Sequence, residues 1–124
     1  MNNEIHFFRA GKLEVVDKDL SPDTLSWDKC LEFIDLFDPE GGWRLPTIAE
    51  FKYLYELHLK EIGRFKKRDY WTGTRYPSNV SNTIDATAVW VMDFSDGMPY
   101  YVDLNMGTSS GGFITNRVRL VRDI

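Results

Sequence analysis

The spacing of apolar residues changes near residue 70, and this change constrains the fold more than any other feature of the chain. In segments 27–37 and 47–58, apolar side chains recur every three or four residues, as on the buried face of a helix. From Tyr70 onward the period shifts toward two, with Trp90 and Met92 on one face of a predicted strand. Helices followed by antiparallel strands predict an α+β fold, with the helices packed on one side of a twisted sheet.

Local signals place the first elements. Segments 4–9 and 12–16 flank Ala10-Gly11 and predict an N-terminal β-hairpin, because glycine takes a positive φ at little cost. Ser26 is placed to cap a first helix, since a serine hydroxyl can accept from the free N–H groups of the first turn. The apolar face expected on this helix consists of Trp27, Cys30, Leu31, Ile34 and Phe37.

A second helix is predicted to begin at Thr47, because Thr47 and Glu50 have the spacing of a capping box. Its expected buried stripe consists of Phe51, Leu54, Tyr55 and His58, and it should stop near Gly63. Further on, Asp96-Gly97 predicts the turn of a second hairpin. The alternating run 117–122 predicts a terminal strand that closes a sheet.

Composition bounds the function. The 124 residues, 43% of them hydrophobic, predict one domain with its own core over residues 1–124. With 15 basic and 19 acidic residues and a net charge of −4, the chain does not suit nucleic acid. The basic cluster 64–68 is interpreted as a solvated loop, the alternative being contact with an acidic partner.

The single cysteine, Cys30, excludes an intrachain disulfide and is interpreted as a small buried hydrophobe. The segment 1–8 lacks the pattern of a secretory signal, and no later run is long and apolar enough for membrane insertion. The sequence as written therefore predicts a cytoplasmic location. A surface or phage-particle location is the alternative if the chain is exported or assembled by another route.

Several spaced motifs occur in order over about residues 25–122: Trp27 and Cys30; Gly42-Trp43-Arg44-Leu45-Pro46-Thr47 with Glu50-Phe51; Tyr70-Trp71-Thr72; Ala88-Val89-Trp90 with Asp93-Phe94 and Gly97; and Val118-Arg119-Leu120-Val121-Arg122. Together they resemble the bacterial domain of unknown function named after the C-terminal domain of collagen-like adhesins. The pattern also looks like a shortened relative of formylglycine-generating enzymes. The resemblance implies a C-type-lectin-like fold.

The motif residues that the resemblance carries over are mostly structural: Trp43, Arg44, Leu45, Pro46, Thr47, Glu50, Trp71, Trp90 and Arg119. Trp71 and Trp90 are expected to fill the core, and Val118, Leu120 and Val121 to belong to the closing strand. Arg44 is interpreted as a structural residue that pairs with an internal carboxylate or backbone carbonyls. The alternative is an anion-binding residue.

The residues that the related enzymes and lectins use for catalysis or calcium binding are absent from this sequence. Formylglycine-generating enzymes use two late cysteines, and none follows Cys30. The related iron-dependent sulfoxide synthases need three histidines, whereas this chain has only His6 and His58. The calcium motifs of C-type lectins, Glu-Pro-Asn or Gln-Pro-Asp with Trp-Asn-Asp, are also missing. We therefore expect no catalytic residues, no metal and no cofactor.

Two irregular stretches, 75–86 and 106–116, remain for function, because loops on a rigid scaffold are where recognition concentrates. The sequence predicts a non-catalytic binding module for a protein or glycan. The candidate contact residues are Tyr76, Asn79, Asn82, Tyr101, Asn105, Met106, Thr108 and Phe113. The alternatives are a structural subunit of a larger assembly and a degenerate or uncharacterised enzyme of the formylglycine-generating-enzyme-like fold.

Overall fold

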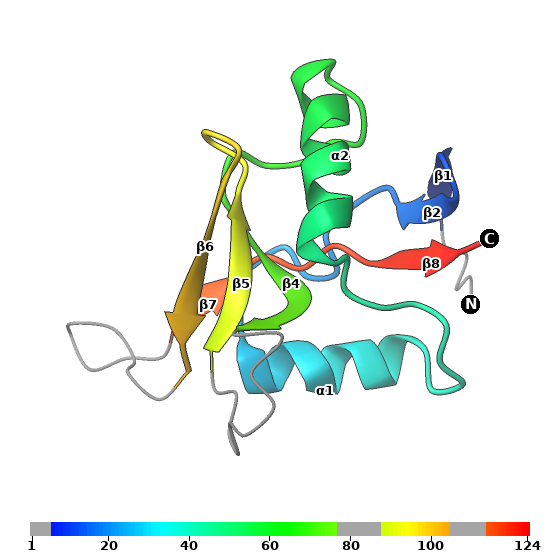
Figure 1. Cartoon of the computed structure of the whole chain (residues 1–124). Coiled ribbons are helices and arrows are strands. Elements are labelled where there is room, and N and C mark those ends of the chain that lie inside the picture. Colours follow the sequence, from blue (N-terminus) through cyan, green and yellow to red (C-terminus); the bar gives the residue numbers. More distant parts are fainter. Residues whose placement is uncertain (1–5, 77–87, 105–113) are drawn as a thin grey trace.

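A computed structural model describes residues 6–76, 88–104 and 114–124 (Figure 1). In chain order, its elements are β1 (Phe7–Ala10), β2 (Leu13–Val16), β3 (Leu25–Ser26), α1 (Trp27–Phe37), α2 (Ile48–Leu59), β4 (Asp69–Tyr76), β5 (Ala88–Asp93), β6 (Met98–Asp103), β7 (Thr115–Asn116) and β8 (Val121–Asp123). The strands form three small antiparallel sheets, β1-β2-β8, β3-β7 and β4-β5-β6. The α+β class and the N-terminal hairpin are confirmed.

Both predicted helix starts are confirmed. The Ser26 hydroxyl accepts from the backbone N–H of Lys29 at 3.4 Å, at the start of α1. Thr47 and Glu50 form a complete capping box at the start of α2, with each side chain bonded to the backbone of the other. These caps satisfy N–H groups that a helix leaves open in its first turn, which explains why both boundaries are legible in the sequence.

The helix α2 packs on one face of the β4-β5-β6 sheet. Its Phe51 and Leu54 are fully buried and share a hydrophobic cluster with Tyr70 and Met92. Tyr70 and Met92 are register partners on β4 and β5, so their side chains lie on the same face of the sheet. Phe94, just after β5, packs edge-on against Phe51 with ring centroids 5.6 Å apart.

The helix α1 packs on the opposite face. Trp71 and Val91, the next pair in register, belong to a second cluster with Cys30 of α1, because successive side chains of a strand alternate in direction. Trp27 of α1 meets Trp71 in an edge-to-face contact at 5.2 Å. The expectation of both helices on one side of a single sheet is therefore wrong: there are three sheets, and the helices cover different faces of one of them.

Two finer expectations are also wrong. Leu31 is 44% exposed rather than part of the buried face of α1, because the second cluster lies under Cys30 and reaches Ile34 and Phe37 instead. Trp90 is half-buried and belongs to neither cluster. By strand alternation it lies on the same face of β5 as Met92.

The C-terminal segment 115–123 links all three sheets, rather than forming the single strand expected over 117–122. β7 pairs with β3, and β8 pairs with β2. Between them, the backbone of Arg117 exchanges hydrogen bonds with β4, at 2.9 Å to Trp71 N and 2.9 Å to Asp69 O. Val118 and Leu120, expected in the closing strand, precede β8 instead; both are buried. This path carries Arg117 and Arg119 into the centre of the molecule, between the elements of the other sheets.

Candidate functional site

The centre of the described structure holds a fully buried arginine. Arg119 donates to Oδ1 of Asp19 from both Nε, at 3.1 Å, and Nη2, at 3.0 Å. Its remaining bonds go to backbone carbonyls: Val16 at 3.1 Å, Gly63 at 2.6 Å and Arg64 at 3.0 Å. The guanidinium also lies over the ring of Phe65, 4.2 Å from its centroid. A buried guanidinium needs this complete set of partners, since an unpaired charge is costly inside a protein.

The Asp19 carboxylate accepts hydrogen bonds from three different side chains. Besides Arg119, its carboxylate accepts from the Tyr70 hydroxyl at 2.9 and 3.1 Å and from Nη1 of Arg117 at 3.3 Å. The Tyr70 hydroxyl in turn accepts from the backbone N–H of Lys66 at 2.9 Å. Burial, with the nearby Asp19 charge, raises the pKa of Tyr70 well above its usual range, so this phenol remains a donor. We call Asp19, Tyr70, Arg117 and Arg119 the polar centre.

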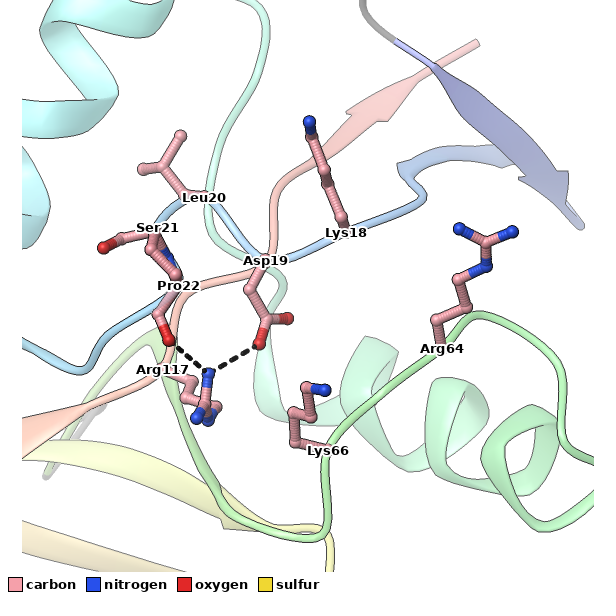
Figure 2. Close-up of a pocket in the computed structure, with 8 residues that line it drawn as sticks. All are labelled: Lys18, Asp19, Leu20, Ser21, Pro22, Arg64, Lys66 and Arg117. Atoms are coloured by element: carbon pink, nitrogen blue, oxygen red, sulfur yellow. Dashed lines mark hydrogen bonds and ion pairs between the residues drawn. The ribbon is translucent and has the colours of Figure 1, made fainter.

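A cavity of about 560 Å³ opens beside the polar centre (Figure 2). Its lining comes from the connection between β2 and β3, from the segment after α2, and from the C-terminal segment: Lys18, Asp19, Leu20, Ser21, Pro22, Arg64, Lys66 and Arg117. Four of these side chains are cationic and one is a carboxylate. The basic cluster 64–68 is interpreted from the sequence as a solvated loop. Two of its side chains, Arg64 and Lys66, line this cavity.

A second polar arrangement lies at the start of α2. Nη1 and Nη2 of Arg44 bond the two carboxylate oxygens of Glu50 at 2.8 and 2.9 Å, and Nη2 also reaches Asp123 at 2.8 Å. The predicted carboxylate partner of Arg44 is therefore confirmed. Chiefly through its hydrogen bond from Arg44, the pKa of Glu50 is held below its ordinary value. This pair ties the capping box to the C-terminus.

The outer strand β6 carries exposed aromatic and apolar side chains. Met98 is 62% exposed, Tyr100 37% and Tyr101 50%. Tyr101 lies opposite Trp90 in the register of β5 and β6, and the two rings meet edge-on with centroids 5.6 Å apart. The Tyr100 hydroxyl donates to the carboxylate of Asp69, whose pKa is raised mainly by burial. In the register of β5 and β6, Trp90 and Tyr101 lie on one face of the sheet, and Met98 and Tyr100 lie on the other. We call the pair Trp90 and Tyr101 the β6 surface.

The predicted contact residues divide into two groups. Tyr101 lies in the β6 surface, and Tyr76 is the last residue of β4. The others lie outside the described residues: Asn79, Asn82, Asn105, Met106, Thr108 and Phe113. Of the predicted structural residues, Trp43, Leu45, Pro46, Trp71 and Arg119 are buried.

Asp19 and Lys18 carry no distinctive signal in the sequence, whereas Lys66 belongs to the basic cluster 64–68. Arg119 stands between Val118 and Leu120 in the alternating run 117–122. That alternation does not reveal the burial of Arg119, and a buried arginine needs an acidic partner. The identity of that partner was hidden, because Asp19 is 100 positions away. No local pattern connects the two.

Other site chemistries find little support in the described residues. Within residues 6–76, 88–104 and 114–124, no three His, Cys, Asp or Glu side chains gather as a metal site would require. Burial raises the pKa of the Cys30 thiol to about 12, which keeps it protonated at neutral pH. Neither described helix is long and apolar enough to span a membrane.

No family model matches this chain, and no curated protein matches it.

Proposed function

We propose that the protein is a non-catalytic recognition module that binds a protein or glycan ligand through the β6 surface and the segments that adjoin it. The observation that carries this proposal is the Trp90–Tyr101 pair. Tyr101 is half exposed, yet its ring is held edge-on against Trp90 on the neighbouring strand. A ring fixed in this way loses little conformational entropy when a ligand covers it.

The position of β6 supports the same proposal. It is the outer strand of the β4-β5-β6 sheet, and Figure 1 shows it at one side of the molecule. The apolar stripes of α1 and α2 are used in the two core clusters. The two rings of the β6 surface are instead partly exposed to solvent, and aromatic side chains are enriched where proteins contact partners.

We further propose that the fold is C-type-lectin-like, as the resemblance implies. Its support is the order of the elements: a hairpin, two helices, then antiparallel strands that end with β8 beside the hairpin. In this proposal the recognition surface lies on β6 and the segments around it, on a scaffold whose termini are joined through the β2-β8 pairing.

Binding to a glycan array and capture of labelled proteins test the function, with wild type compared with Tyr101→Ser. Tyr53→Ser is the matched control, because Tyr53 is 46% exposed but lies on α2. We expect Tyr101→Ser to weaken the bound signal by roughly tenfold or more, as loss of a central aromatic contact does. Tyr53→Ser should retain it. A ligand held equally by wild type and Tyr101→Ser would contradict the proposal.

A further inference from the structure

The cavity beside the polar centre has a strong excess of positive charge. Lys18, Arg64, Lys66 and Arg117 line it with Asp19 as the one carboxylate among the lining residues. Asp19 is already paired with the fully buried Arg119, at 3.0 Å. Asp19 also pairs with Arg117, at 3.3 Å, so this single carboxylate is shared by two arginines and the lining has a net positive charge.

Three of these cations are available to a ligand. In the part of the chain that the structure describes, Lys18, Arg64 and Lys66 are exposed, and none makes an ion pair with a carboxylate. Arg117 is only 18% exposed and bonds Asp19 and the carbonyl of Pro22, as Figure 2 shows. Its Nε is buried and has no hydrogen-bond partner within the described residues. Exposed cations that no carboxylate neutralises are suited to an oxyanion.

The backbone that carries Arg64 and Lys66 is held by the polar centre. Arg119 bonds the carbonyls of Gly63 and Arg64, and the Tyr70 hydroxyl accepts from Lys66 N. The backbone of Arg64 has φ +56°, which is uncommon for a residue with a side chain and persists where surrounding contacts fix it. The same buried groups therefore fix both the carboxylate side and the basic side of the cavity.

We propose that this cavity binds the phosphate group of a small phosphorylated molecule. A phosphate monoester carries nearly two negative charges at pH 7 and presents three oxygens, which matches several cationic donors from different segments. The volume of about 560 Å³ exceeds that of the phosphate group alone and lies in the range of small-molecule sites. This site is independent of the β6 surface, since no residue of that surface lines the cavity.

Isothermal titration calorimetry at pH 7 and constant ionic strength tests the proposal with three titrants: glucose 6-phosphate, inorganic phosphate and glucose. We expect saturable binding of the phosphate-bearing titrants with dissociation constants near or below about 1 mM, and no binding of glucose. Tighter binding of glucose 6-phosphate than of inorganic phosphate supports an ester as the ligand. Equal binding of the two would contradict an ester as the ligand and would assign the site to free phosphate.

Lys66→Gln should weaken binding of the phosphate titrants roughly tenfold. The matched control is Lys67→Gln, because Lys67 is also exposed and adjacent but does not line this cavity. Circular dichroism melting of both variants distinguishes a loss of binding from a loss of folding. Lys66→Gln should fold normally, because Lys66 contributes only its backbone N–H to the polar centre. Equal losses in the two variants, equal binding of glucose, or no saturable binding of either phosphate titrant up to about 10 mM would overturn the proposal.

Discussion

Asp19 and Arg119, which are 100 positions apart in the sequence, form a buried ion pair with Nη2 of Arg119 3.0 Å from Oδ1 of Asp19. The pair joins the connection between β2 and β3 to the C-terminal segment. Through its bonds to Gly63 and Arg64, Arg119 also fixes the segment that follows α2. Three distant parts of the chain thus depend on one guanidinium.

Asp19→Asn should therefore strongly destabilise the protein. The amide leaves a fully buried guanidinium without its counter-charge, and breaking a buried pair in this way costs about 3–5 kcal/mol. Urea unfolding followed by circular dichroism measures the loss. Asp17→Asn removes the same charge two residues earlier, from a side chain that is not a partner of Arg119, and should change the midpoint little. Matching midpoints for Asp19→Asn and wild type would show that the pair does not hold the fold together.

The Arg44–Glu50 pair predicts an acid-dependent contribution to stability. The folded state lowers the pKa of Glu50 below its ordinary value of 4.5, first of all through the hydrogen bond from Arg44. The folded state then binds the proton less readily than the unfolded chain, so the contribution is present above pH 4.5 and is lost as pH falls through the lowered pKa.

Glu50→Gln should accordingly lower the melting temperature at pH 7 and lower it less at pH 3. Because Arg44 is 34% exposed, solvent screens the pair and the expected loss at pH 7 is only about 1 kcal/mol. Glu56→Gln, exposed on the same helix, controls for removing one negative charge from α2. A gap between wild type and Glu50→Gln that stays constant from pH 7 to pH 3 would be inconsistent with this linkage.

The structure leaves no room for a methyl group at Gly97. Its φ is +75°, and a Cβ there would lie 2.4 Å from Cε2 of Tyr55. The Tyr55 ring packs edge-on against Phe94, with centroids 5.6 Å apart, which restricts its retreat. Gly97→Ala should therefore lower the melting temperature by more than backbone strain alone would.

Gly41→Ala provides the comparison, because Gly41 also has a positive φ, +84°, but no atom lies within 4 Å of the added Cβ. Both variants carry a backbone cost of roughly 1–2 kcal/mol. Thermal melting of the two should place Gly97→Ala lower by at least about 3 °C. Equal melting temperatures would mean that Tyr55 moves aside without cost.

The parts of the fold that can be predicted from the sequence are those with a local signal. Ser26 and the Thr47–Glu50 capping box fix helix starts through side chains that bond backbone groups three residues away, and Gly11 and Gly97 mark turns through their positive φ. Each of these needs only a few consecutive residues to be recognised.

The burial and partners of a residue could not be predicted from the sequence where they depend on contacts with distant parts of the chain. Trp71 and Trp90 are both aromatic strand residues, but only Trp71 lies under α1, and the position of that helix is set by tertiary packing. The apolar character of Leu31 predicts burial, yet Leu31 is exposed and is not part of the second cluster. Likewise, no sequence pattern links Asp19 with Arg119 or with the cavity. The two residues come into contact only because the C-terminal segment folds back beside the connection between β2 and β3.

The most direct test of the proposed function is amide hydrogen exchange with and without the ligand captured by the wild-type protein. We predict slower exchange on binding within Met98–Asp103 and Ala88–Asp93, the strands that carry the Trp90–Tyr101 pair, and unchanged exchange within Ile48–Leu59 of α2. Protection confined to α2, with the exchange of β5 and β6 unaffected, would contradict the assignment of recognition to the β6 surface.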